Sequence, residues 1–477
     1  MSDQAADSFD FVILGAGAAG EAALELARES GASVAIIDKD LFGGSCAYWA
    51  CMPSKALLHA AAIHHGGGDY PWPKASDFRD WMINREGIAY PSDETHEKRY
   101  REAGAEPIRG VARLDGPGRV RVTLKGGEGG SRGGGEGGER VLQAQHVIVS
   151  VGSHARIPEV KGLDRIEWWD NKKATGTREL PRSLLVMGGG PTGIELAQVY
   201  VRYGVPVTVV DPNPRILARD HHRNSSTITE ALVREGAIVR TMVRAVRVDP
   251  GGGEDGAHRV TLSDGSTADG HEVLVVIGRA IPWQDLGLET IGVAATERMP
   301  KPDERLRIAD DVFVVGDPAG PEMHTHLAHY QGEMAVRIAL GEDVKPDYRA
   351  IPRALYTDPE AASVGLFLEQ ALEAGYDAFE ATADLAETAK GFVSECSGHV
   401  TIVIDRQSRC LLGAAIAGPG ASELIHEAVL AVKAQVPLAV LADTIHAFPT
   451  AARVMGNLFV QVHRELGGMA RPRQTVF

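Results

Sequence analysis

Cysteine and long apolar runs are both scarce in this chain of 477 residues. Its four cysteines are too few for a disulfide-stapled extracellular scaffold. No run of about 18 apolar residues is present. The acidic N-terminus leads directly into a predicted strand and lacks the basic start and cleavable apolar segment of a signal peptide. We therefore expect a cytoplasmic protein that does not associate with membranes.

An excess of positive charge is absent as well. The chain has 49 Lys and Arg against 64 Asp and Glu, which gives a formal net charge of −15. A field of that sign repels phosphate backbones and anionic lipid headgroups, so nucleic acid and membrane partners are disfavoured. The composition, with 44% hydrophobic and 24% charged residues, is that of globular domains. Because 477 residues exceed what one hydrophobic core supports, we expect several domains.

Two segments repeat one plan: an apolar strand, a glycine-rich turn, a helix of small residues and a second strand that ends in an acid. They are Asp10–Asp38 and Ser183–Asp211. This spacing predicts two βαβ units with parallel strands. Between them, the low-complexity tract Gly126–Gly138 is interpreted as a flexible hairpin tip. After about residue 348, strands followed by an amphipathic helix at Ala421–Gln435 predict a third domain of α+β type.

The first glycine-rich turn predicts a dinucleotide site. Gly15, Gly17 and Gly20 fit the pattern G-x-G-x-x-G between a strand and a helix. The glycines permit a tight turn and a close approach of the backbone, and the helix N-terminus attracts a pyrophosphate. Asp38 closes the second strand, where an acid can bind ribose hydroxyls.

The second turn predicts a site for a nicotinamide nucleotide. Gly188, Gly190 and Gly193 form the same pattern, and Asp211 follows at the end of the next strand. A carboxylate there accepts hydrogen bonds from the 2′-OH of NADH and repels the 2′-phosphate of NADPH. We therefore expect NADH, although Arg215, which lies only four residues further on, leaves NADPH open as the less favoured nucleotide.

One cysteine pair has the setting of a redox centre. Cys46 and Cys51 lie five residues apart at the start of a predicted helix. In an ideal helix their Cα atoms would be roughly 8–9 Å apart, whereas a disulfide needs less than about 7 Å, so a bridge requires a local distortion. Pro53 provides a cause. The helix N-terminus should lower the thiol pKa values. No partner cluster completes a zinc site, and Cys396 and Cys410 have the setting of ordinary thiols.

Together these motifs resemble the pyridine nucleotide–disulfide oxidoreductase family, whose members include dihydrolipoyl dehydrogenase, glutathione reductase and mercuric reductase. Further matching stretches are Val151–Pro158, Ile277–Val293, the strand that ends in Asp317, and the C-terminal segments TDPEAASVG and AAIAGPGASELI. The resemblance covers nearly the whole chain.

The resemblance implies an α/β fold with two Rossmann-like dinucleotide-binding domains, for FAD and NAD, and a C-terminal α+β dimerisation domain that forms a homodimer. The implied boundaries place the FAD-binding domain at residues 1–165 and 286–347, the NAD-binding domain at 166–285 and the dimerisation domain at 348–477.

The resemblance also implies roles for matched residues. Cys51 would be the thiol next to the flavin, and Cys46 the thiol that attacks the substrate. Lys55 and Glu195 would pair near flavin N5, where a cation favours the anionic reduced flavin. Further positions that the family uses for cofactor binding are Lys39, Gly44, Ser45, Gly152, Ser153, Gly278, Arg279, Gly316, Asp317 and Ala328.

The chain departs from the family near its C-terminus. Disulfide reductases of the family usually end in a pattern like H-P-T-x-x-E, whose histidine and glutamate handle protons for the thiols. Here Phe448 and Arg453 stand at those positions. His446, two residues earlier, is interpreted as structural. Arg453 cannot shuttle protons at neutral pH, although it could hold Cys46 as thiolate or bind an anionic substrate. By analogy, packing beside the flavin is expected of His324, His326 and His329.

We therefore expect an FAD-dependent oxidoreductase that passes electrons from NADH through Cys46 and Cys51 to a small acceptor other than ordinary dihydrolipoamide or glutathione disulfide. Two alternatives remain: reduction of quinones, dyes or a metal ion, and cleavage of a 2-ketothioether by a family enzyme that also carries Phe at the histidine position. The C-terminus GGMARPRQTVF lacks the cysteine pair of mercuric reductases. A non-catalytic redox sensor is disfavoured, because two complete nucleotide sites indicate turnover.

Overall fold

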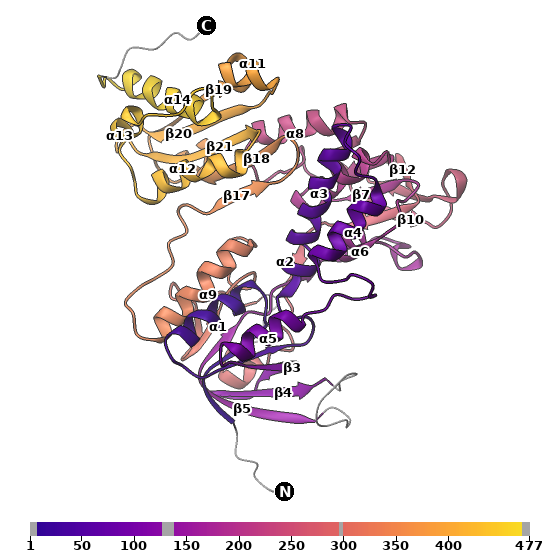
Figure 1. The fold of residues 1–477 in the computed structure, drawn as a ribbon, viewed down its shortest axis with the longest axis vertical. Coiled ribbons are helices and arrows are strands. Elements are labelled where there is room, and N and C mark those ends of the chain that lie inside the picture. Colours follow the sequence, from indigo (N-terminus) through magenta and orange to yellow (C-terminus); the bar gives the residue numbers. More distant parts are fainter. Residues whose placement is uncertain (1–6, 126–137, 295–298, 470–477) are drawn as a thin grey trace, which may run out of the picture. The chain divides into compact units, whose positions relative to one another are not determined.

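The computed structural model of the chain describes residues 7–125, 138–294 and 299–469 (Figure 1). These residues form two compact units, each assembled from three segments of the chain. The first unit contains the chain up to Ala56, Ser76–Arg156 and Gly278–Pro346, and the second contains Leu57–Ala75, Ile157–Ile277 and the chain from Asp347 onward. The domain boundaries expected at residues 165, 285 and 347 stay predictions. The glycine-rich tract at 126–137 lies outside the described residues.

The first unit is built on a seven-stranded sheet. Its parallel part has the order β3, β2, β1, β5, β16, and the long strands β3 and β5 continue into an antiparallel meander with β4. The parallel strands are nearly continuous runs of apolar residues because both faces of such a sheet are covered. The strands are β1 (Asp7–Leu14), β2 (Val34–Asp38), β3 (Glu106–Leu114), β4 (Arg119–Leu124), β5 (Glu139–Val149), β15 (Arg307–Ala309) and β16 (Val312–Val314), with a separate pair β6 (His154–Ala155) and β14 (Arg279–Ala280).

Helices α1 (Ala18–Glu29) and α9 (Thr325–Ala339) lie side by side and cover one face of this sheet (Figure 1). Gly332 permits this approach, because a Cβ atom there would lie 2.2 Å from the carbonyl oxygen of Ala19. The other helices that begin in this unit are α2 (Gly44–Tyr48), α3 (Cys51–His65) and α5 (Glu94–Glu102), and α4 (Trp72–Met82) ends in it.

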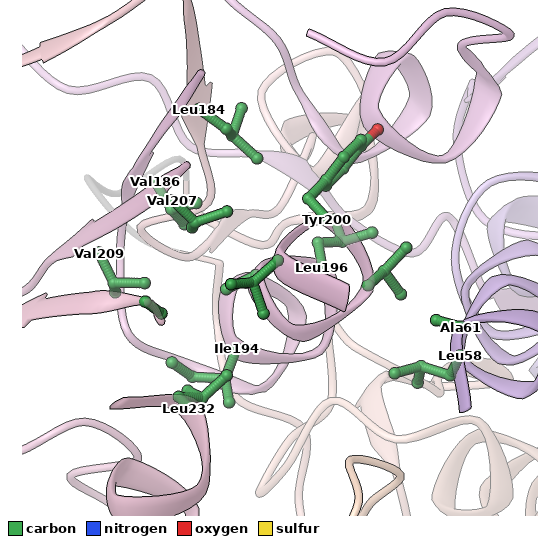
Figure 2. Packing of buried hydrophobic residues seen from close by; sticks show 14 of the residues in the cluster. Leu58, Ala61, Leu184, Val186, Ile194, Leu196, Tyr200, Val207, Val209 and Leu232 are labelled. Carbon is green, nitrogen blue, oxygen red and sulfur yellow. The ribbon is translucent and has the colours of Figure 1, made fainter. Parts of the chain in front are cut away.

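The part of the second unit that precedes residue 278 has a parallel four-stranded sheet in the order β13, β7, β8, β9. Figure 2 shows Ile194 and Leu196 of α7 in the apolar cluster that also contains Val186, Val207 and Val209 from β7 and β8. The elements are α6 (Asn171–Gly176), β7 (Leu184–Met187), α7 (Pro191–Arg202), β8 (Val207–Val210), α8 (His222–Arg234), β9 (Ile238–Arg240), β13 (Glu272–Val275), and an antiparallel sheet of β10 (Ala245–Asp249), β11 (His258–Leu262) and β12 (Thr267–Gly270).

The C-terminal part of the second unit is a five-stranded antiparallel sheet in the order β17, β18, β21, β20, β19. Side chains of β20 alternate: Val400 and Ile402 join the core under α12 to α14, whereas His399 bonds on the opposite face to Asn224 of α8. The elements are β17 (Pro352–Leu355), β18 (Glu360–Gly365), α10 (Leu368–Glu373), β19 (Ala378–Asp384), α11 (Ala389–Ser394), β20 (His399–Asp405), β21 (Leu411–Gly418), α12 (Ala421–Lys433), α13 (Leu438–Asp443) and α14 (Ala451–Glu465).

The two predicted βαβ units and the α+β segment are confirmed. The units are β1–α1–β2 and β7–α7–β8, and their strands pair in parallel. The predicted helix at Ala421–Gln435 is α12, which ends two residues earlier. In the part of the chain that the structure describes, no helix has both the length and the apolar character needed to cross a membrane.

Candidate active site

The first and third glycines of both motifs are required by the packing of the chain itself. Gly15 has φ +107° and Gly188 has φ +116°, in the region where side chains are strained. A Cβ atom at either position would lie 2.4 or 2.5 Å from a main-chain oxygen of a neighbouring strand end. At Gly20 and Gly193, a Cβ atom would lie 2.0 or 2.1 Å from the carbonyl oxygen of the first glycine. These four glycines form the tight turn and let the helix pack on the strand.

The middle glycines leave room for a ligand. Gly17 and Gly190 have ordinary φ values of −83° and −79° and precede α1 and α7 without a side-chain cap. A Cβ atom at Gly17 would come no closer than 3.8 Å to Gly44, and one at Gly190 would meet nothing within 4 Å. A side chain at either position would therefore not clash with the protein itself. It would, however, fill the space of a phosphate that binds the free N–H groups of the helix N-terminus, which explains the glycine. Both turns therefore fit a dinucleotide.

Asp38 and Asp211, the acids at the ends of the second strands, each accept a hydrogen bond from the main chain of their glycine-rich turn. The N–H of Ala16 donates to Asp38 at 2.8 Å, and the N–H of Gly189 donates to Asp211 at 2.7 Å. Burial raises the pKa of the Asp38 carboxyl despite these backbone hydrogen bonds. Asp38 also accepts from the N–H of Asp40 at 2.8 Å, and Asp211 accepts from the N–H and the side-chain amide of Asn213, each at 2.8 Å. A carboxylate offers about four acceptor sites, so a ribose hydroxyl can still donate to either acid.

The Arg215 side chain is held by hydrogen bonds to its own loop. Its guanidinium donates to the carbonyl oxygens of Leu217 at 2.9 Å and Asp220 at 2.7 Å. An arginine held by its own loop must break both hydrogen bonds before it can bind a phosphate.

Three predicted cofactor residues meet in the first unit. Nη2 of Arg279 donates to the carbonyl oxygen of Ser153 at 2.8 Å, and its Nε lies 3.5 Å from a carboxylate oxygen of Asp317. The hydroxyl of Ser153 donates to the same carboxylate. Each of the three residues follows a glycine with positive φ, at Gly152, Gly278 and Gly316. Of the other predicted positions, Ala328 is buried at the start of α9, whereas Lys39 and Ser45 are exposed.

The cysteines lie on either side of a helix break. Helix α2 ends at Tyr48, Trp49 has φ −130° outside the helical range, and α3 begins at Cys51. Pro53 explains the position of the break, because its ring would clash with the carbonyl of Trp49 four residues earlier in a continuous helix. The predicted distortion is confirmed. Tyr48 and Trp49 are buried and anchor the segment that carries Cys46.

The sulfurs of Cys46 and Cys51 interact with each other and with one hydroxyl. The Thr325 hydroxyl donates to the sulfur of Cys46 at 3.2 Å and lies 3.5 Å from the sulfur of Cys51. The hydrogen bond with Cys51 and burial raise the pKa of the Cys46 thiol, although the Thr325 bond opposes this. The prediction of a lowered pKa is therefore wrong for Cys46 in the dithiol form, because a neighbouring thiol and burial outweigh the helix N-terminus.

Sequence reasoning missed Thr325. It begins α9, 274 residues after Cys51, so only the folded chain brings its hydroxyl to the thiols. The available signal was its position shortly after Asp317, between His324 and His326 at the N-terminus of a helix.

Lys55 and Glu195 lie in different units. Lys55 follows Cys51 by one turn of α3, and its Nζ is 3.4 Å from the hydroxyl of Ser54. Glu195 lies on α7, is 5% exposed, and accepts a hydrogen bond from the N–H of Tyr356 at 3.1 Å. Their pairing near a flavin stays a prediction.

The segment that the sequence predicts to replace the family's proton-handling pair exposes an aromatic side chain. Phe448 is 58% exposed, and Arg453 lies in the first turn of α14, which Thr450 caps. Nε2 of His446 is 2.8 Å from Glu427, and its Nδ1 is 3.1 Å from the carbonyl oxygen of Thr444. The Glu427 hydrogen bond raises the pKa of His446. With both ring nitrogens engaged, His446 fits the structural interpretation.

Comparison with known proteins agrees with these features. The family model for pyridine nucleotide-disulphide oxidoreductases matches residues 9–332, and the model for the dimerisation domain of the same family matches residues 351–458. The chain belongs to the pyridine nucleotide-disulphide oxidoreductase family. It is therefore one of the FAD-dependent oxidoreductases that use a pyridine nucleotide, and the expected α/β fold with a C-terminal dimerisation domain is confirmed.

Individual relatives match along nearly their whole length. A dihydrolipoyl dehydrogenase of Halobacterium salinarum is 32% identical over 92% of this chain and 93% of its own. A mercuric reductase of Streptomyces lividans is 30% identical over 95% and 96%. The Cu(II) complex of the HOCl-induced flavoprotein disulfide reductase RclA from Escherichia coli has a TM-score of 0.82 over 96% of this chain and 100% of that chain, at 22% identity, which shows the fold alone.

Proposed function

We propose that this protein is an NADH-dependent flavoprotein reductase that delivers electrons through the Cys46–Cys51 couple to a small disulfide or another small acceptor. The observation that carries the proposal is the thiol pair itself: two cysteines across a helix break, in contact with each other and with one hydroxyl. FAD, when bound, accepts hydride from the nicotinamide and passes electron pairs to a neighbouring sulfur.

The residues that would hold the two nucleotides are those with the matching geometry. The turn at Gly15, Gly17 and Gly20 would take the FAD pyrophosphate, with Asp38 on the ribose. The turn at Gly188, Gly190 and Gly193 would take the nicotinamide nucleotide. Asp211 at its strand end, together with an Arg215 held by its own loop, supports NADH over NADPH. We further propose a homodimer, because the C-terminal domain matches a dimerisation domain.

A second candidate is reduction of a quinone or a metal ion as substrate. Phe448 and Arg453 stand where the family usually has its proton-handling pair, and an acceptor without a leaving thiol needs no such pair. The Streptomyces lividans relative, named a mercuric reductase, supports the metal-ion form of this candidate.

Thiol counting after NADH addition separates the two candidates. Anaerobic addition of about one equivalent of NADH to the oxidised holoenzyme should release two new thiols per chain, measured with a chromogenic disulfide after quenching in denaturant. Cys46→Ser should release no additional thiol, whereas Cys410→Ser, which alters a cysteine outside the couple, should behave like the unaltered chain. Bleaching of the flavin without new thiols would reject the dithiol route and favour the second candidate.

A further inference from the structure

A histidine–carboxylate pair adjoins Thr325, the residue of the first unit whose hydroxyl contacts both thiols. His324 immediately precedes Thr325, whose hydroxyl contacts the sulfurs of Cys46 and Cys51. Nε2 of His324 is 2.8 Å from Oε2 of Glu322. Consecutive Cα atoms are about 3.8 Å apart, so the His324 ring is anchored within one side-chain length of the hydroxyl that joins the two sulfurs.

Glu322 determines which nitrogen of His324 can take a proton. An ionised carboxylate only accepts hydrogen bonds, so the neutral ring carries its hydrogen on Nε2 and keeps a lone pair on Nδ1. No residue within 7–125, 138–294 or 299–469 forms a hydrogen bond with that Nδ1. The ring of His326 stacks on it, with centroids 5.1 Å apart and planes 10° apart, which restrains its orientation. A base held by a carboxylate is the arrangement that activates hydroxyl and thiol nucleophiles.

His446, two residues before the position where the family usually has its histidine, lacks this freedom. Its two ring nitrogens are both engaged, and its side chain is 6% exposed against 30% for His324. It therefore has no nitrogen available for a thiol unless its hydrogen bonds break.

The thiol pair needs a base. The neighbouring Cys51 thiol and burial raise the pKa of Cys46. Little Cys46 thiolate is therefore present at neutral pH unless a base accepts its proton. Neither Phe448 nor Arg453 can accept a proton from it at that pH. A general base works within hydrogen-bond reach or through one water, and such contacts often close only when substrate binds.

We propose that His324, oriented by Glu322, is the acid/base of thiol–disulfide exchange at Cys46, supplied by the same unit that carries the thiols; the proposal rests on the proposed function. Nδ1 takes the proton of Cys46 as its sulfur attacks one sulfur of the acceptor RSSR′. A Cys46–SR bond forms, the acceptor's S–S bond breaks, and the leaving R′S⁻ receives the proton.

The second step regenerates the disulfide. Cys51 displaces RS⁻ from Cys46, forming the Cys46–Cys51 bond, and its proton goes to RS⁻. When electrons from NADH reduce the Cys46–Cys51 disulfide back to the dithiol, the net reaction is NADH + H⁺ + RSSR′ → NAD⁺ + RSH + R′SH.

Alkylation of the reduced protein tests the base without any nucleotide. Dithiothreitol-reduced holoenzyme is treated with iodoacetamide across a pH series, and modification of Cys46 is followed by peptide mass mapping. In His324→Gln the rate at about pH 7 should fall at least tenfold, and the difference from the unaltered rate should narrow as the pH rises, because hydroxide then takes the proton that His324 would accept. Glu322→Gln, which keeps a hydrogen-bond acceptor but loses the charge, should show a smaller fall.

His65→Gln is the matched control, because His65 is an exposed histidine at the end of α3 and should leave the profile unchanged. Superimposable profiles for His324→Gln and the unaltered protein would overturn the proposal. Since dithiothreitol generates the thiols here, this result is independent of whether NADH reduces them, and so of the proposed function.

The acid role is tested by the choice of acceptor. After reduction by NADH, the enzyme is mixed rapidly with an aromatic disulfide, 5,5′-dithiobis(2-nitrobenzoate), whose leaving thiolate needs no proton, or with bis(2-hydroxyethyl) disulfide, whose leaving thiolate does. His324→Gln should slow the alkyl acceptor about 10²-fold and the aromatic acceptor much less. Equal slowing of both would exclude His324 as the acid.

Discussion

At the scale of single residues, the Thr325 hydroxyl influences the ionisation of Cys46. Its hydrogen bond lowers the pKa that the neighbouring thiol and burial raise. Thr325→Val keeps the shape but removes the donor, so the pKa of Cys46 should rise further, by about one unit. Alkylation at a fixed pH below this pKa should then be about tenfold slower. Thr325→Ser should retain the unaltered profile, and a valine variant with the same profile would contradict this role.

The charge of Asp211 should determine the choice of nucleotide. In the unaltered enzyme kcat/KM for NADH should exceed that for NADPH by at least about tenfold, because a carboxylate repels the 2′-phosphate. Asp211→Asn removes the charge and keeps an acceptor for the N–H of Gly189, so the ratio should narrow by about tenfold. Steady-state comparison of the two nucleotides measures this. Equal values in the unaltered enzyme would show that Asp211 does not face the 2′ position.

At the scale of elements, features set by neighbouring residues could be predicted from the sequence, whereas contacts between residues far apart in the chain could not. The glycine turns and the helix break before Cys51, which Pro53 imposes, follow from steric limits between neighbouring residues, so they could be predicted. The contact of Thr325 with Cys46 joins positions 279 residues apart, and no local pattern encodes it. The raised pKa of Cys46 has the same origin, because burial and neighbouring groups are properties of the folded chain.

A buried histidine connects α8 with β20 in the second unit. His399 is 4% exposed, and its ring nitrogens are 2.9 Å from Asn224 Oδ1 and 2.9 Å from the Thr401 hydroxyl. The amide of Asn224 also donates to the carbonyl oxygen of Ala362 on β18. This network ties the nucleotide-binding part of the unit to its C-terminal sheet through hydrogen bonds of a neutral imidazole.

Acid should weaken this connection. Burial, with the nearby positive charges of Arg223 and the neighbouring histidines, lowers the pKa of His399 from 6.5 to about 3. Between those values the unfolded chain binds a proton that the folded chain does not, so stability is retained above about pH 6.5 and lost as the pH falls towards 3. From about pH 7 to about pH 5 the loss should be about 2 kcal/mol.

Urea unfolding of the holoenzyme at both pH values measures this loss. His399→Gln offers an amide donor and acceptor in place of the ring nitrogens but does not titrate, so its stability should fall less over the same interval. Identical losses in both proteins would assign the acid sensitivity to other groups.

At the scale of the whole molecule, the C-terminal domain should assemble two copies of the chain. The dimerisation model of the family covers residues 351–458. Exposed apolar side chains of this domain include Leu430, Val440, Ile445 and Phe448, which a partner surface would remove from water. Sedimentation equilibrium at micromolar concentration should give about twice the mass of one chain. A monomer with full activity would contradict the dimer.

The departure at Phe448 and Arg453 should limit which acceptors the molecule can use. Reduction of the oxidised enzyme by NADH should be fast, while turnover with lipoamide should be slow, because the sequence predicts that Phe448 and Arg453 replace the family's proton-handling pair. Phe448→His alone should raise lipoamide turnover by less than about threefold, since the imidazole would lack its orienting carboxylate. Phe448→His together with Arg453→Glu should raise it by about tenfold or more.

A double-mutant cycle then connects this pair with His324. If both histidines serve the same sulfur, His324→Gln should cost far less turnover in the Phe448→His, Arg453→Glu background than in the unaltered chain, because the restored pair can take the proton instead. The measurement is kcat for lipoamide in all four proteins, with flavin content as the check on folding. Additive effects would mean that the two histidines act on different steps. Family-typical lipoamide turnover by the unaltered enzyme would show that Phe448 imposes no limit on this acceptor.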